Sequence, residues 1–272
     1  MMSTSPLIDR DALLAHRRRA DTADLFLHRA AMDDVQDRLA MVNREFTAPA
    51  VVTPFPDFWR DAFPAAVCVA DSDTIELQPG AHDLVIHAMG LHWANDPVGQ
   101  LIQCRRALRE DGFFLSIAPG GQTLAQLRAV LGQAETEITG GLSPRIAPMG
   151  EIRELGALLQ RAGFALPVAD SIDLTASYRD IYHLMHDLRA MGETNALSHR
   201  LRRATGRAVF RRAGELYQQH FGEPDGRIPA RFELVCLTGW SPSESQPKPL
   251  RPGSAQMRLA DALDTTETPL PD

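Results

Sequence analysis

Glycine is absent from the first part of this chain, because the first of its 19 glycines is Gly80. Glycine lets a backbone pass close to a ligand and adopt a positive φ without a Cβ clash. The first turn of a nucleotide-binding α/β fold depends on that freedom. A fold of that type with no glycine in its first turn therefore either does not bind the usual nucleotide or binds it abnormally.

Cysteines and long apolar runs are also scarce. Cys68, Cys104 and Cys236 show no CxxC spacing, so we expect neither a metal site nor a disulfide framework. No run of eighteen apolar residues is present, and the N-terminus lacks the apolar segment of a signal peptide. These absences predict free thiols, no transmembrane segment and a cytoplasmic location.

Basic residues are outnumbered by acidic ones, 28 to 35, which gives a formal net charge of −7. Nucleic-acid-binding domains usually carry a basic face that neutralises several phosphates, so this balance argues against nucleic acid as a partner. The apolar content of 44% is enough for a buried core in a chain of 272 residues.

Three regions are expected along the chain. Residues 1–45 are interpreted as an N-terminal helical segment, and residues 46–240 as an α/β domain with helical insertions between Gly120 and Phe221. Residues 241–272 contain six prolines and no aromatic residue, so we expect this tail to be disordered.

Hydrophobic periodicity predicts alternating strands and helices in the α/β domain. Strands of this spacing, joined by helices, indicate a mostly parallel, Rossmann-like sheet. We expect a buried strand at 66–70 and an antiparallel strand at 232–238 that forms the edge of the sheet. Asp57 is interpreted as the N-cap of a short aromatic helix. The other predicted strands lie at 50–53, 83–89 and 113–118, and the other predicted helices lie at 24–42, 97–108, 124–131, 152–162 and 181–191.

The string from His87 to Asp96 lies where a parallel strand ends, and ligands of open α/β sheets bind outside such strand ends. His92 and Trp93 are therefore candidate catalytic residues, with a proton-handling imidazole beside a flat apolar wall. Packing of Trp93 in the core is an equally good interpretation. Asp96 is better explained as the N-cap of the helix that begins at Pro97.

Several strings of the chain resemble known proteins. The segment from Asp83 to Arg128 looks like the second half of a class I S-adenosylmethionine (SAM)-dependent methyltransferase, of the subgroup that includes malonyl carrier-protein methyltransferase. The resemblance to the assembly factors of respiratory complex I is stronger and covers roughly Asp9 to Ala255. That family hydroxylates an arginine of a complex I subunit despite its methyltransferase fold. The strings that carry the resemblance are LHW-ND, GGQTLAQLR, SPR, MGETNAL, LTGW and QPKPLRPGSA.

The chain also departs from the family's pattern in its first half. Its members place a DxGxGxG-like loop, a helix, a second strand and another helix before the third strand. Here only about fifteen residues separate Val52 from Val67, enough for one helix but not for an additional strand and helix. Pro54 and Pro56 offer no N–H to a ligand. We expect the aromatic residues of this segment to fill part of the former cofactor cleft; they are Phe55, Phe58 and Trp59.

The resemblance implies SAM as the cofactor and a protein client, possibly a complex I subunit, as the partner. If SAM binding is retained, the cofactor-binding residues are Asp71, Ser72, His87 and Met89, although Asp71 is equally explained as the cap of a turn. Two functions follow. The favoured one is a degenerate, client-binding assembly factor, a pseudoenzyme with weak or no SAM binding. The other is an active SAM-dependent methyltransferase or hydroxylase with an atypical first loop, so enzymatic activity stays open.

Clustered arginines form the strongest local charge feature of the chain. Their usual meaning is a solvated helix face, and the alternative is a docking surface for an acidic partner. The candidate partner-binding residues are Arg202, Arg203, Arg207, Arg211 and Arg212.

Two turns, Ser143 to Arg145 and Gly192 to Asn195, match family strings, and the first is a candidate lid of the active site.

Overall fold

The computed structural model describes residues 6–247 and residue 265. The chain divides into two compact units, one that ends at Pro242 and one that begins at Ser243. The fold described below is that of the first unit. Most of the tail predicted to be disordered lies outside the described residues.

A six-stranded mixed sheet with the order β2-β1-β3-β4-β6-β5 forms the centre of the unit. The first four strands in chain order run parallel, and the last two pair antiparallel to their neighbours. The Rossmann-like α/β fold is therefore confirmed. The strands are β1 (Pro49–Val52), β2 (Val67–Val69), β3 (His82–Ala88), β4 (Leu108–Pro119), β5 (Ala165–Tyr178) and β6 (Ile228–Trp240).

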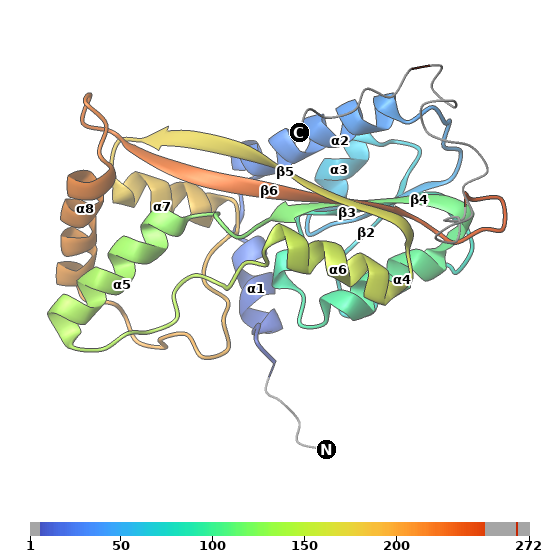
Figure 1. Cartoon of the computed structure of the whole chain (residues 1–272). Helices are drawn as coiled ribbons and strands as arrows, with labels where there is room; N and C mark the ends of the chain where they lie inside the picture. Colours follow the sequence, from blue (N-terminus) through green and yellow to red (C-terminus); the bar gives the residue numbers. More distant parts are fainter. Residues whose placement is uncertain (1–5, 248–264, 266–272) are drawn as a thin grey trace, which may run out of the picture. The chain divides into compact units, whose positions relative to one another are not determined.

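Helices cover both faces of the sheet (Figure 1). Alternate residues of β3 face opposite sides: Leu84 and Ile86 pack with α2, whereas Val85 packs with α4 and α6. This alternation is the reason that β3 is buried along its whole length. The helices are α1 (Arg10–Arg17), α2 (Phe26–Met41), α3 (Pro56–Ala62), α4 (Pro97–Ala107), α5 (Ala125–Thr139), α6 (Ile152–Ala162), α7 (Ile181–Ala190) and α8 (Arg207–Phe221).

The connection from β1 to β2 consists of one seven-residue helix, α3, as the short spacing predicts. Strand β2 then pairs directly with β1 and ends the sheet on that side. The expectation that 66–70 form a buried strand is wrong, because an edge position leaves Val67 50% exposed. Asp57 lies in the first turn of α3 rather than at its N-cap, which is Phe55.

The prediction that 232–238 form the edge of the sheet is also wrong. Strand β6 lies between β4 and β5, with Leu115 opposite Thr238 on one side and Val168 opposite Thr238 on the other. The edge is β5, in a region expected to be helical. Its exposed residues include Asp173 and two serines, and the strand also contains Pro167 and Asp170, a composition that is poor in strand signals.

Candidate functional site

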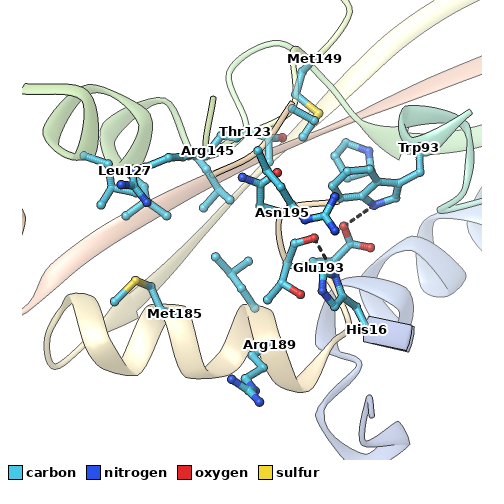
Figure 2. A pocket seen from close by; sticks show the side chains of 18 of the residues that line it. His16, Trp93, Thr123, Leu127, Arg145, Met149, Met185, Arg189, Glu193 and Asn195 are labelled. Atoms are coloured by element: carbon cyan, nitrogen blue, oxygen red, sulfur yellow. Dashed lines mark hydrogen bonds between the residues drawn. The ribbon is translucent and has the colours of Figure 1, made fainter. Parts of the chain in front are cut away.

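A cavity of about 580 Å³ lies beyond the carboxyl end of β4, between α5, α7 and two loops at 140–151 and 191–206. Figure 2 shows Leu127 of α5 and Met185 of α7 on its walls, with Trp93 and Glu193 at its other side. Its apolar walls are formed by Leu27, Leu124, Leu127, Leu131, Ile146, Ala147, Met149, Met185, Leu188, Leu201, Phe210 and Phe232.

Glu193 is held at the wall of this cavity by the two candidate catalytic residues. The Trp93 Nε1–H donates to Glu193 Oε2 at 2.8 Å, and His92 Nε2 lies 3.1 Å from the same oxygen. Burial alone would raise the pKa of Glu193, but the neighbouring His92 and Arg17, with the hydrogen bonds from His92 and Trp93, lower this pKa to about 2. An ionised carboxylate only accepts hydrogen bonds, so His92 Nε2 carries the proton between them.

The local backbone explains how these three residues meet. A 3₁₀ turn, Leu91–Trp93, follows β3 and directs His92 and Trp93 toward the end of α7. That helix is followed by Gly192 at a φ of 78°, where a Cβ would lie 3.2 Å from Arg17 Cα. Glycine at this position lets the chain turn from α7 into Glu193 while α1 packs against it.

The turn from Ser143 to Arg145, predicted as a candidate lid, is fixed by a buried carboxylate of α5. Glu135 accepts hydrogen bonds from Ser143 Oγ at 2.6 Å and from Arg145 Nη2 at 2.7 Å. Burial raises the pKa of Glu135, but Arg145 and Ser143 outweigh it and lower the pKa to about 2. Asn195 Nδ2 donates to the Pro144 carbonyl at 2.9 Å. The turn is therefore a wall of the cavity, joined to the Gly192–Asn195 turn.

Asp71 is buried beside two arginines and does not cap a turn. It is 2% exposed, and Arg17 Nη1 of α1 lies 2.7 Å from Asp71 Oδ1. Arg10 Nη2 donates to the Asp71 carbonyl at 2.9 Å. The carboxylate fits because Gly90 lacks a side chain: a Cβ there would lie 2.7 Å from Asp71 Oδ2.

The other three candidate cofactor residues divide into buried and exposed positions. His87 and Met89 are 0% exposed, and His87 Nε2 lies 2.8 Å from Gln100 Oε1. Ser72 is exposed, and its carbonyl accepts a hydrogen bond from Gln100 Nε2. Asp71, His87 and Ser72 are thus linked through Gln100, whose side chain also reaches the Asp71 carbonyl at 3.3 Å.

Aromatic residues pack beside the carboxyl end of β1; that they fill a former cofactor cleft stays a prediction. Phe55, Phe58 and Trp59 surround His28 of α2, with ring centroids 5.1, 6.2 and 6.3 Å from the imidazole. The Trp59 Nε1–H donates to His28 Nδ1 at 3.1 Å. Burial lowers the pKa of His28 to about 3, so this imidazole is neutral at physiological pH.

Sequence reasoning missed Arg17, His28 and Glu135. Each one acts on a residue that the sequence did suggest, namely Asp71, Trp59 and Arg145. Arg17 carried a weak signal, because it belongs to a run of three arginines in a helix that begins after the N-cap Asp9. Within residues 6–247, no group of three His, Cys, Asp or Glu side chains is placed to hold a metal ion.

Comparison with known proteins agrees with this architecture. Residues 20–116 match the family of methyltransferase domains. This part of the chain is similar to a methyltransferase domain. The chain is 36% identical over 198 residues to the mitochondrial arginine-hydroxylase NDUFAF5 of Danio rerio, an alignment that covers 73% of the chain and 61% of the relative. The corresponding protein of Homo sapiens is 35% identical over 220 residues, with coverages of 81% and 64%.

The chain is also similar to a bacterial enzyme. The malonyl-[acyl-carrier protein] O-methyltransferase of Laribacter hongkongensis is 34% identical over 180 residues, which cover 66% of the chain and 58% of that enzyme. The chain therefore spans about three-fifths of the length of these curated relatives. No helix in the described part of the chain is long and apolar enough to cross a membrane.

The structure separates the candidate partner-binding arginines of the chain into two groups. Arg212 joins α8 to α5 through Glu137 at 2.6 Å, and Arg202 Nη2 lies 3.3 Å from Asp9. Arg203, Arg207 and Arg211 are exposed. Arg211 is 4.0 Å from Glu215, whereas Arg203 and Arg207 form no ion pair with another described residue.

Proposed function

We propose that the protein is a client-binding assembly factor of the kind that serves respiratory complex I, with weak or no binding of SAM. The observation that carries this proposal is that the strings that resemble the family lie together around the large cavity. GGQTLAQLR contributes Thr123 and Leu127 to the large cavity, SPR contributes Arg145, and MGETNAL contributes Glu193 and Asn195. The residues expected at the cofactor, in contrast, are mostly buried in protein contacts.

Three features of the cofactor position support weak or absent binding of SAM. Asp71, the candidate acidic residue, is already paired with Arg17. Pro54 and Pro56 remove two backbone donors from the loop after β1. Met89 is 0% exposed and belongs to the main hydrophobic core. These residues do not fit the ribose hydroxyls and the carboxylate that a SAM site has to satisfy.

The chemistry of the large cavity supports a basic side chain of a protein client as its guest. Glu193 places an ionised carboxylate at one end of apolar walls, an arrangement that suits an aliphatic stem with a cationic head. The relatives are named for arginine hydroxylation, and we propose a client arginine here. Arg19 and Arg189 at the same cavity favour acidic residues beside that arginine in the client.

A second function, an active SAM-dependent methyltransferase or hydroxylase with an atypical first loop, is favoured by one observation. Arg17 Nε and Nη2, Arg10 Nη1 and Asp71 Oδ2 are buried and have no hydrogen-bond partner among the described residues. Buried polar atoms are usually satisfied, so a polar guest at this position would complete them. A cytoplasmic location stays a prediction, because the eukaryotic relatives are named as mitochondrial proteins.

Calorimetric titration of the full chain with SAM distinguishes the two functions. We expect no saturable heat; saturable binding would overturn the proposal of weak or no binding and favour the enzyme. For the client, purification of the tagged chain should recover complex I subunits, and Glu193→Gln should reduce that recovery. Glu76→Gln, which changes an exposed carboxylate that does not line the cavity, is the matched control. Equal recovery with both variants would contradict the role of Glu193.

A further inference from the structure

A second cavity, of about 330 Å³, is lined by His92 and Ser116, which do not line the large cavity. It is formed on the face of the sheet that α4 and α6 cover, beside the carboxyl half of β4. Its walls are mainly apolar and include Leu91, Ala118, Leu155, Leu158, Val235 and Leu237. The volume falls at the low end of those that bind small molecules.

Two polar atoms in this apolar lining have no partner. Ser116 is 1% exposed, and its Oγ has no hydrogen-bond partner among the described residues. The His92 side chain is 2% exposed, and its Nδ1 is likewise without one. Both residues line the second cavity. Because buried polar groups are nearly always hydrogen-bonded, two such atoms in one cavity point to a ligand with a polar head.

The hydrogen-bonding positions left open by His92 and Ser116 define that polar head. His92 Nε2 is engaged by the Glu193 carboxylate, so Nδ1 is the ring nitrogen left for a ligand. The Ser116 hydroxyl both donates and accepts. A ligand hydroxyl matches this pair, since it can itself donate or accept at either position.

We propose that this cavity binds a small, mainly apolar molecule that carries one hydroxyl group, an alcohol or a phenol. Its hydroxyl lies between Ser116 and His92, and its apolar body lies against Leu155, Leu158 and Val235. Asn95, another polar residue of the lining, does not compete for the hydroxyl. Its Oδ1 accepts from Ile8 N and its Nδ2 donates to the Ile8 carbonyl.

The test compares two probes of nearly the same shape, p-cresol and p-xylene, which differ by a hydroxyl in place of a methyl group. Each is titrated into the full chain by calorimetry. We expect saturable binding of p-cresol that is roughly fivefold or more tighter than that of p-xylene, the ratio expected for one net hydrogen bond.

Variants then locate the site. Ser116→Ala should weaken the binding of p-cresol by roughly fivefold and leave the binding of p-xylene unchanged, since it removes one hydrogen bond and little volume. Ala118→Leu, which fills the cavity from β4, should weaken the binding of both probes. Ser171→Ala, at an exposed serine of β5, is the matched control and should change neither. Circular dichroism verifies that each variant is folded.

Three results would overturn the proposal: no saturable binding of p-cresol to the wild-type chain, equal affinities for the two probes, or an unchanged affinity for p-cresol in both folded Ser116→Ala and folded Ala118→Leu. None of them concerns SAM or the protein client, so a failure here is separate from a failure of the proposed function.

Discussion

Arg17 of α1 and Asp71, which follows β2, form a buried ion pair across 54 residues of sequence, with side chains 6% and 3% exposed. The pair attaches the N-terminal helix to the carboxyl edge of the parallel strands. The pair lies beside Gly90, and Asp71 is one of the residues that we predict to bind SAM if that binding is retained. Several consequences of this arrangement can be measured.

Removing Arg17 should destabilise the protein strongly. Arg17→Met leaves the Asp71 carboxylate buried and unpaired, which costs about 3–5 kcal/mol of unfolding free energy. Urea denaturation measures the change. The control is Arg231→Met, which breaks an ion pair with Asp173 whose side chains are 42% and 54% exposed and should cost less than about 1 kcal/mol. If Arg17→Met loses no more unfolding free energy than Arg231→Met, burial does not make the Arg17–Asp71 pair more important than an exposed pair.

A side chain at Gly90 should expel Asp71 from its position. Gly90→Ala would place a Cβ 2.7 Å from Asp71 Oδ2, and we expect a loss of about 1–3 kcal/mol from the displaced atoms. Gly132→Ala is the matched control, because this α5 glycine has its nearest neighbour at 3.5 Å and alanine favours a helix. Thermal unfolding should show a loss of stability for Gly90→Ala and a gain for Gly132→Ala. Unchanged stability of Gly90→Ala would show that the Asp71 carboxylate relocates at little cost.

The Glu135–Arg145 contact should make stability depend on pH in acid. The pKa of Glu135 falls from 4.5 to about 2 on folding, so its contribution is complete above pH 4.5 and is lost as the pH falls toward 2. The upper limit of this contribution is about 3 kcal/mol. Urea unfolding should be measured for the wild type and for Glu135→Gln at pH 6 and at pH 2.5. The wild type should be the more stable protein at pH 6, and the difference in unfolding free energy between the two should be smaller at pH 2.5. A difference independent of pH would exclude Glu135 as its source.

Charge reversal should separate docking arginines from structural ones. The triple variant Arg203→Glu, Arg207→Glu, Arg211→Glu should lower the association rate with an acidic client roughly tenfold at low salt, and less as salt screens the charges. Recovery of complex I subunits by the tagged chain gives a first measurement. Arg212→Glu should instead loosen α8 from α5 and lower stability. Unchanged client recovery by the triple variant would mean that the exposed arginines are only a solvated face.

The elements that the sequence predicts well are those whose signal is local. Strand β3 is a seven-residue buried run, and Asp96 caps α4 by accepting from Gly99 N at 2.8 Å. Strand β5 was missed because one of its faces is in solvent and its sequence mixes proline with polar residues. The pairing of β5 with β6, rather than its own composition, makes it a strand.

The candidate site was only partly predictable for a similar reason. His92 and Trp93 were suggested by their place after β3, but their shared partner, Glu193, lies 100 residues further along the chain. Arg17 contacts Asp71 through its side chain and lies against Gly192 through its backbone, and both residues are distant in sequence. Contacts between such distant residues leave no pattern in a single sequence, so they could not be inferred from spacing.

The attachment of α1 also limits when the protein can fold during its synthesis. Ile8 bridges Leu197, and Asp9 N donates to the Ala196 carbonyl at 2.8 Å, so the first helix cannot reach its final place until nearly 200 residues have been translated. At 5–20 residues per second this takes on the order of ten seconds or more. Strand β5 waits longer still, since β6 has to be inserted between it and β4. A ribosome-bound chain that ends before residue 228 would therefore expose the edge of β4, where a chaperone would be expected to act.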